Sequence, residues 1–156
     1  MATRGGPRVE VAGISDAAKI ARLLHDFNTE YDEPTPGTAA LEARLVELID
    51  GDETLVLLAG DGPDGLALLR FRPALWSPGL ECYLAELYVR PDARGLGLGR
   101  ALMEAALRTA RERGADSMEL GTDETDTVAR RLYESLGFRN QAPGDQGSMY
   151  FYARDL

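Results

Sequence analysis

The chain has 156 residues, 44% of them hydrophobic, which is enough for one globular domain with a sizeable core. Its net charge of −9 disfavours nucleic-acid binding, which needs a positive surface, and no apolar run is long enough to cross a membrane. A single cysteine and an amino end without a signal-like apolar stretch point to a cytoplasmic protein.

The first half of the chain predicts a strand, two helices and a hairpin. An alternating segment at residues 8–13 is followed by apolar positions at helical spacing from Ala17 to Tyr31. The prolines of DEPTPG stop this helix, and a second helix runs from Thr38 to Gly51. Two short apolar runs then flank the sequence DGPDG, which is typical of a β-hairpin.

The second half begins with the longest strand, Leu80–Arg90. We expect a helix through Arg113 next, followed by a strand at Ser117–Thr122. A helix from Thr125 or Asp126 to Gly137 and closing strands at 138–142 and 148–156 complete the chain. The order β-α-α-β-β-β-α-β-α-β-β indicates one domain, residues 1–156, of the α/β (α+β) class. We expect a mixed, mostly antiparallel central sheet of about seven strands with four helices, including one parallel crossover after the longest strand.

A glycine-rich loop, RGLGLG at residues 94–99, joins the longest strand to the following helix. Glycines permit backbone shapes and close approaches that a Cβ would block. The first amides of a helix are unpaired, and the helix dipole makes that end weakly positive. The loop is therefore suited to a phosphate group, with Arg94 and Arg100 placed to add charge-assisted bonds.

Two common phosphate-binding patterns do not fit this loop. The dinucleotide pattern lacks its third glycine, and the nucleoside-triphosphate loop needs Lys and Ser or Thr where Arg100 and Ala101 stand. What remains, with Arg94, Gly97 and Gly99 in the pattern Gln/Arg-x-x-Gly-x-Gly/Ala, resembles the GNAT acetyltransferase superfamily. A helix bearing a tyrosine before Gly-Phe, ARRLYESLGF, is a second family element, and the resemblance covers the whole chain.

The resemblance implies acetyl-CoA as co-substrate, lying along the longest strand where that strand splays from its neighbour. Main-chain groups of Leu87 and Val89 would bond the pantetheine arm, and loop amides would hold the diphosphate. Leu96 and Leu98 would supply only amides, and both are expected to pack underneath the loop. The expected coenzyme-binding residues are Leu87, Tyr88, Val89, Arg94, Gly95, Leu96, Gly97, Leu98, Gly99, Arg100 and Asp126.

Two residues are candidates for catalysing acyl transfer from a thioester to an amine. Glu86 lies inside an apolar strand, where burial would raise its pKa from about 4.3 and suit it to act as a base. An ion-paired carboxylate at a strand bulge is the alternative. Tyr133 is protonated at neutral pH and suited to donate to the leaving sulfur, although core filler is the alternative for a tyrosine on an amphipathic helix. Tyr88 is an alternative donor, and strand alternation places Cys82 on the same side as Glu86.

The acceptor side is expected in HDFNTEYDEP, residues 25–34, which lines the acceptor pocket in the family. Acids and aromatic rings suit an ammonium group, so Phe27, Glu30 and Tyr31 are the expected substrate-binding residues, with a solvated helix end as the alternative. Asp126 replaces an asparagine that often bonds the pantetheine arm, and it also fits a helix N-cap. The lone histidine, His25, gives no support for a metal site.

These features predict an N-acetyltransferase that moves an acetyl group from acetyl-CoA to a primary amine of a small molecule or peptide. No Ser-His-Asp or Cys-His arrangement is evident, which favours direct attack in a ternary complex. The alternative is a catalytically silent acetyl-CoA-binding or sensing domain. No metal, nucleic-acid or membrane partner is expected, and the apolar segment MYFYA near the carboxyl end suggests an edge that pairs in a homodimer.

Overall fold

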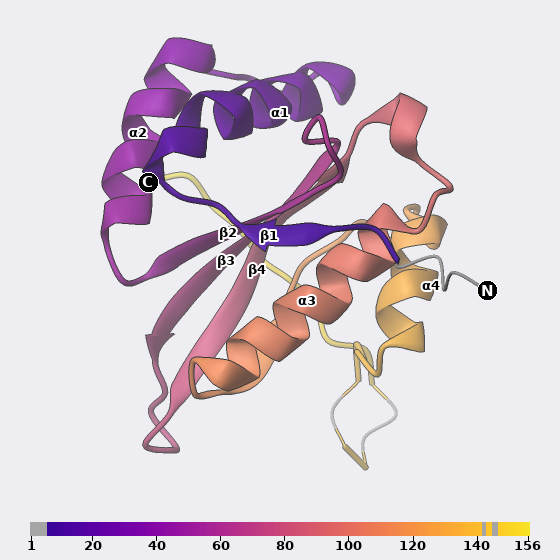
Figure 1. Cartoon of the computed structure of the whole chain (residues 1–156). Helices are drawn as coiled ribbons and strands as arrows, with labels where there is room; N and C mark the ends of the chain where they lie inside the picture. The colour runs from indigo at the N-terminus through magenta and orange to yellow at the C-terminus, as the bar shows by residue number, and fades with distance from the viewer. Residues whose placement is uncertain (1–5, 142, 145–146) are drawn as a thin grey trace, which may run out of the picture. The chain divides into compact units, whose positions relative to one another are not determined.

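The structure of the chain is a computed structural model that describes residues 6–141, 143–144 and 147–156 (Figure 1). The chain divides after Glu119 into two compact units, and each unit is described by itself. The elements of the first unit are β1 (Val9–Val11), a 3₁₀ turn (Ile14–Asp16), α1 (Ala17–Glu30), α2 (Thr38–Asp50), β2 (Thr54–Ala59), β3 (Gly65–Pro73), β4 (Leu80–Val89), a second 3₁₀ turn (Pro91–Ala93), α3 (Leu98–Glu112) and β5 (Ala115–Glu119). Their order is the one that the sequence predicts.

The first unit contains a five-stranded sheet with the spatial order β1-β2-β3-β4-β5. Neighbouring strands from β1 to β4 are antiparallel: α1 and α2 lie between β1 and β2, a hairpin joins β2 to β3, and a short turn joins β3 to β4. β4 and β5 are parallel, and α3 forms the crossover that connects them. The predicted parallel crossover and mixed sheet are therefore confirmed.

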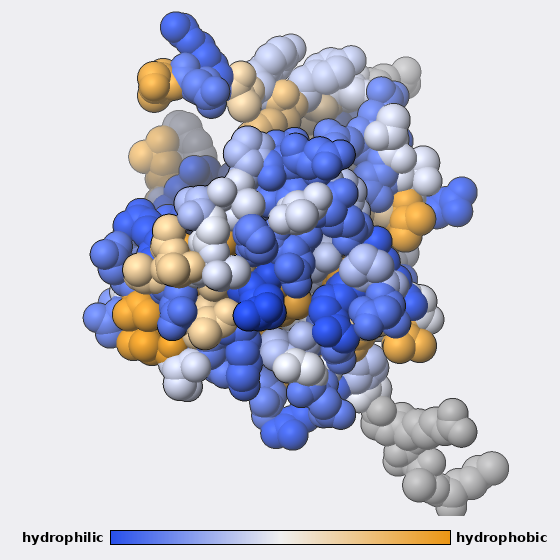
Figure 2. Space-filling model, turned by 90° about the horizontal axis from the view of Figure 1, so that it is seen from above, coloured by the Kyte–Doolittle hydropathy of each residue, from blue (hydrophilic) through white to orange (hydrophobic). Residues whose placement is uncertain are grey.

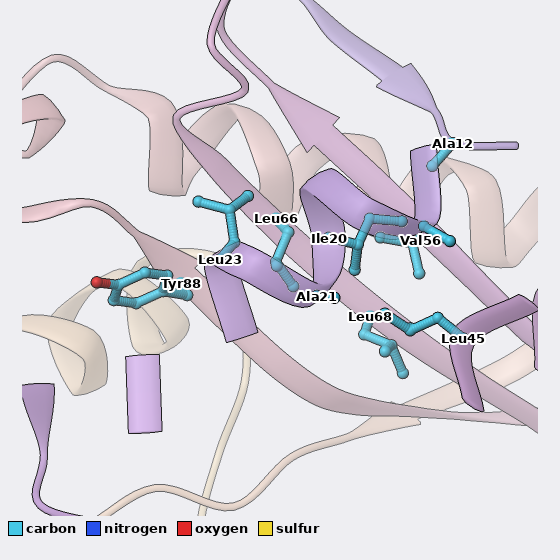
Figure 3. Close-up of a cluster of buried hydrophobic side chains, with 10 residues drawn as sticks. Ala12, Ile20, Ala21, Leu23, Leu45, Val56, Leu66, Leu68 and Tyr88 are labelled. Carbon is cyan, nitrogen blue, oxygen red and sulfur yellow. The ribbon is translucent and has the colours of Figure 1, made fainter. Parts of the chain in front are cut away.

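Helices cover both faces of this sheet, with α1 and α2 on one face and α3 on the other (Figure 1). On the α1 face, Ile20 and Leu45 pack against Val56, Leu66 and Leu68 of the sheet, and Tyr88 lies at one end of this cluster (Figure 3). Hydrophilic side chains cover most of the surface seen from above in Figure 2, with apolar residues scattered among them. The apolar sides of the helices therefore supply the core, as their helical spacing predicts.

A β-bulge in β4 changes which face of the sheet its side chains reach. Leu69 pairs with Leu84 and Leu68 pairs with Glu86, so Ala85 is an extra residue with no partner in β3. Because Leu68 and Leu69 point to opposite faces, Leu84 and Glu86 do so as well. The prediction that Cys82 shares a side with Glu86 is therefore wrong: alternation holds from Cys82 to Leu84, and the bulge then turns Glu86 to the α1 face.

The second unit contains α4 (Thr127–Ser135), which is the last predicted helix. After it, the described residues form one isolated antiparallel bridge, Gln141 with Ser148, and no further strand. Part of the predicted strand at 138–142 lies outside the described residues, since residue 142 is not among them. The expected seven strands are thus not confirmed; alternation in sequence indicates a tendency to extend, but a strand also needs a hydrogen-bonded neighbour.

Gly65 at the start of β3 offers a test of how tightly the sheet packs against α3. A Cβ built on Gly65 would lie 2.9 Å from the Tyr88 carbonyl oxygen and 3.2 Å from Leu102 Cδ1. Gly65→Ala is expected to lower the free energy of unfolding by about 1–3 kcal/mol, because the backbone of β4 must shift. Gly121→Ala is the matched control, since its Cβ would meet only Phe151 at 4.0 Å. Equal thermal midpoints for the two variants would contradict this account of the packing.

Candidate functional site

The β4 strand has one edge that β5 leaves open. β5 pairs with β4 only from Leu80 to Tyr83, so the rest of β4 has no strand on that side in the described part of the chain. Arg90 N–H donates to the Asp64 carbonyl at 2.9 Å, which turns the main chain of alternate residues toward β3. Leu87 and Val89 therefore direct their main-chain groups to the open edge. β4 thus continues past the end of β5, where the resemblance implies that the coenzyme lies.

The glycine loop follows at the end of this edge. Gly95 and Gly97 have positive φ angles of 78° and 82°, which L-residues with a side chain rarely adopt. A Cβ added at either position would meet nothing within 4 Å, so the space beside the loop is open. Leu98 is buried, as predicted, but Leu96 is 69% exposed, so the prediction that both leucines pack underneath is wrong for Leu96. The left-handed turn at Gly95 directs residue 96 outward.

Main-chain amides of the loop are available to an anion. Arg94 N–H donates to Pro91, and the next main-chain hydrogen bond in the chain is Ala101 N–H to Gly97 at 3.0 Å. Among the described residues, no carbonyl accepts from the amides of Gly95 to Gly99. These amides surround the amino end of α3, where the helix dipole favours negative charge. The loop therefore fits a diphosphate group.

The Arg94 side chain joins three parts of the first unit. Its Nε donates to the Val89 carbonyl at 3.0 Å, and its Nη2 donates to both carboxylate oxygens of Glu30, at 2.9 and 2.8 Å. The guanidinium carbon also lies 5.8 Å from the centre of the Tyr88 ring. Arg94 is thus anchored to the end of β4 and the end of α1 before the glycines begin. Arg100 lies further along the chain, and its Nη1 is 4.0 Å from Glu104 Oε1 on the surface of α3.

The three predicted substrate-binding residues lie together at the end of α1. Phe27 stacks on Tyr88 with ring centres 4.7 Å apart, and Tyr31 meets Phe27 edge-on at 5.4 Å. The Tyr88 hydroxyl donates to Glu30 at 2.9 Å, so this phenol proton is engaged. Burial, the bond to Glu30 and its charge raise the pKa of Tyr88 to about 12. Tyr31, at 55% exposure, is the aromatic ring of this group that solvent reaches most easily.

Glu30 carries its charge in a partly buried position. Burial alone would raise its pKa, but hydrogen bonds from Arg94 and Tyr88, with the charge of Arg94, hold the pKa below its ordinary value. The carboxylate is therefore ionised throughout the neutral range. Sequence reasoning placed Glu30 and Arg94 in different sites, because they are 64 residues apart. An acid at the carboxyl end of a helix, where the dipole disfavours it, was the available signal.

Glu86 lies at the bulge of β4, on the face that α1 covers. Its side chain is half-buried, and no described residue donates a hydrogen bond or ion pair to its carboxylate. Burial raises the pKa of Glu86 above its ordinary value. The bulge belongs to the alternative that the sequence offered for Glu86, but the ion pair of that alternative is not found among the described residues.

Tyr133 and Asp126 belong to the second unit. Tyr133 is buried in α4, with its ring centre 6.1 Å from that of Phe138. Burial, with a smaller effect of the Asp126 charge, raises the pKa of Tyr133 to about 12. Asp126 Oδ1 accepts from the Ala129 amide at 3.1 Å, so Asp126 is the N-cap of α4.

The described part of the chain gives little support for a metal site, a reactive thiol or a membrane-spanning helix. It holds no group of three or more His, Cys, Asp and Glu side chains able to bind a metal ion. Cys82 is buried, and burial raises the pKa of its thiol to about 11, which disfavours the reactive thiolate. None of the described helices is long and apolar enough to cross a membrane.

Comparison with known proteins is informative about this arrangement. Residues 18–138 match the family model of the acetyltransferase (GNAT) family. The chain is 34% identical over 139 residues to a mycothiol acetyltransferase of Beutenbergia cavernae, which covers 86% of this chain and 46% of that protein. It is 30% identical over 132 residues to an uncharacterised N-acetyltransferase of Bacillus subtilis. That match covers 83% of this chain and 88% of the Bacillus protein. The chain thus spans about half the length of its mycothiol acetyltransferase relative.

Solved structures agree with the sequence comparison. A putative acetyltransferase from Arthrobacter sp. FB24 is 48% identical, with a TM-score of 0.91 over 100% of this chain and 99% of that one. A probable acetyltransferase of known structure is 22% identical and shares the fold, with a TM-score of 0.80 over 94% of this chain and 99% of that one. Together with the family match, these likenesses show that the chain belongs to the GNAT family of acetyltransferase enzymes.

Proposed function

We propose that the protein is an acetyl-CoA-dependent N-acetyltransferase that acetylates a primary amine by direct attack in a ternary complex. The observation that carries this proposal is the open edge of β4, which runs from Glu86 directly into the glycine loop. GNAT acetyltransferases use acetyl-CoA as co-substrate, and an extended pantetheine arm suits an open strand edge. We further propose that the protein acts in the cytoplasm as a homodimer, for which Tyr150, Phe151 and Tyr152 offer exposed aromatic surface.

The coenzyme-binding part uses the main chain more than side chains. We propose that Leu87 and Val89 bond the pantetheine arm, while amides from Gly95 to Arg100 hold the diphosphate. The Val89 carbonyl already accepts from Arg94, so its amide is the group left for the arm. Leu96 and Leu98 contribute amides, Gly99 permits close approach at the first turn of α3, and Tyr88 forms part of the pocket wall. Asp126 is proposed to contact the arm as an acceptor, besides capping α4.

Glu86 is the proposed base. An ammonium group cannot attack a thioester, so the amine must lose a proton, directly to Glu86 or through a water molecule. A carboxylate with a raised pKa is a stronger base than an exposed one, because burial has removed part of its solvation. The acetyl group of acetyl-CoA supplies the electrophilic carbon, and placing the amine beside it supplies acceleration by proximity.

Tyr133 is the proposed donor to the leaving sulfur. With a pKa of about 12, its phenol remains protonated across the neutral range. A thiol has a pKa of about 8.5, so complete proton transfer from this phenol to a thiolate would be uphill. Tyr133 therefore acts by donating a hydrogen bond that stabilises the developing negative charge on sulfur, which is an electrostatic contribution.

A silent binding domain is the competing function, and the state of Glu86 favours the enzyme. A half-buried carboxylate that finds no partner among the described residues costs folding free energy, which a domain that only binds acetyl-CoA has no reason to retain. On the acceptor side, we propose that Phe27 and Tyr31 form the wall of the amine site, whereas Glu30, the third expected residue, is engaged by Tyr88 and Arg94. Tyr31 is the most exposed of these rings, and ring faces attract ammonium groups.

Acetyl-CoA binding and turnover test the proposal. Calorimetry is expected to show uptake of one acetyl-CoA per chain, and a panel of primary amines is expected to contain acceptors that release free CoA thiol. NAD and ATP serve as controls, because the loop lacks the residues that those ligands need. Binding of NAD or ATP without acetyl-CoA would overturn the function, and binding without release for any amine would favour the silent domain.

The catalytic roles predict a separation of turnover from coenzyme affinity. Glu86→Gln is expected to lower kcat/KM about 10²–10⁴-fold, and Tyr133→Phe about tenfold or more, while both keep the acetyl-CoA Kd within about twofold. The acidic limb of the pH profile that belongs to Glu86 should lie above its ordinary pKa and vanish in Glu86→Gln. Glu42→Gln, on the exposed side of α2, and Tyr150→Phe are matched controls. Wild-type rates in both active-site variants would contradict the assigned roles.

The unpaired Glu86 also predicts a pH-dependent stability difference. Because its pKa is raised in the folded protein, folding loses stability as pH increases through that pKa, and the penalty is absent below the ordinary value of 4.5. Glu86→Gln should therefore unfold at a higher temperature than the wild type at pH 8, by about 2–4 °C for about 1 kcal/mol. The difference should shrink as pH is lowered toward 5. A less stable variant at pH 8 would show that Glu86 has a stabilising partner.

A further inference from the structure

The carboxylate at the carboxyl end of α1 is held in an unfavourable place by specific partners. Glu30 is the last residue of α1, where the helix dipole repels negative charge. Its side chain is nevertheless only 26% exposed and accepts three hydrogen bonds, one from the Tyr88 hydroxyl and two from Arg94. These bonds, and not the helix, explain why an acid stands at this position.

Two of the three guanidinium nitrogens of Arg94 already donate hydrogen bonds. Nε is bound to the Val89 carbonyl, and Nη2 is bound to both oxygens of Glu30. The remaining nitrogen, Nη1, makes no hydrogen bond to any described residue. Arg94 immediately precedes Gly95 in the chain, and its guanidinium group is fixed by contacts to the end of β4 and the end of α1.

We propose that Glu30 is a positioning residue for the coenzyme diphosphate: it holds Arg94 so that Nη1 donates to a phosphate oxygen and the loop starts in the binding conformation. This inference rests on the proposed acetyl-CoA-dependent function. It gives Glu30 a role on the coenzyme side, in place of the acceptor-side role that its position in the sequence suggests. Both Glu30 oxygens already face a guanidinium, which an incoming ammonium group would have to displace.

Two effects of Glu30 on the diphosphate oppose each other, and the geometry decides between them. Its negative charge repels phosphate, but this repulsion acts between partly exposed groups and is screened by salt. Its three hydrogen bonds order a long arginine side chain before the coenzyme arrives, which removes an ordering cost from binding. Because the bonds are short and the guanidinium bridges two oxygens, ordering outweighs repulsion, and loss of Glu30 weakens binding.

A double-mutant cycle measures this coupling. Acetyl-CoA Kd is determined by calorimetry for the wild type, Glu30→Gln, Arg94→Met and the double variant. Glu30→Gln is expected to raise Kd about threefold to tenfold, and in the Arg94→Met background it should add nothing, because Glu30 acts only through Arg94. The amine KM at saturating acetyl-CoA should stay unchanged in Glu30→Gln.

A truncated acyl donor distinguishes a loss of diphosphate binding from a general loss of activity in the variant. Acetyl-pantetheine carries the thioester without the diphosphate, so Glu30→Gln and the wild type should use it equally well. Glu42→Gln, which removes the same charge from the exposed side of α2, should keep the wild-type Kd for acetyl-CoA. If Glu30→Gln does not fold, Glu30→Asp enters the same cycle; it keeps the charge at shorter reach and should give a smaller loss in the same direction.

The outcomes separate this inference from the function on which it rests. An unchanged or lower acetyl-CoA Kd in Glu30→Gln overturns the positioning role, as does an equal loss with acetyl-pantetheine. A raised amine KM with an unchanged acetyl-CoA Kd returns Glu30 to the acceptor site. If the wild type itself takes up no acetyl-CoA, the proposed function fails first.

Discussion

The candidate site of the first unit depends on the point at which β5 ends and β4 continues. β4 and β5 share hydrogen bonds up to Tyr83 and Glu119, and beyond them β4 keeps main-chain donors and acceptors that no described strand satisfies. Such an edge is a liability in a protein that binds nothing, since it invites pairing with other chains. Here the edge leads into a glycine loop whose amides from Gly95 to Gly99 donate to no carbonyl of the described residues, so both features are suited to the proposed extended, anionic ligand.

The bulge at Ala85 links this edge to the chemistry proposed for Glu86. Without the extra residue, Glu86 would continue the alternation of Cys82 and Leu84 and lie under α3. The bulge turns it toward the α1 face, where the aromatic group of Phe27 and Tyr88 also lies. One inserted residue therefore decides whether this carboxylate belongs to the core or to a candidate site, and bulges often serve to re-aim side chains in this way.

Features that depend on residues close together in the chain could be predicted from the sequence. Features that depend on the pairing of distant strands could not. The order of elements, the hairpin, the glycine loop and the N-cap at Asp126 follow from apolar spacing and turn residues within a few positions. The side of Glu86 depends on how β3 pairs with β4, and the partners of Glu30 lie 58 and 64 residues away. The exposure of Leu96 depends on a left-handed turn, and hydropathy does not encode it.

Recognition through peptide groups leaves the intervening side chains under little chemical constraint. The Leu96 amide donates to no carbonyl of the described residues while the side chain is exposed to solvent, so many residue types fit there equally well. The glycines with positive φ have no such freedom, because a side chain would strain the turn itself. The positions between these glycines can therefore change during evolution without loss of the main-chain groups that are proposed to bind the coenzyme.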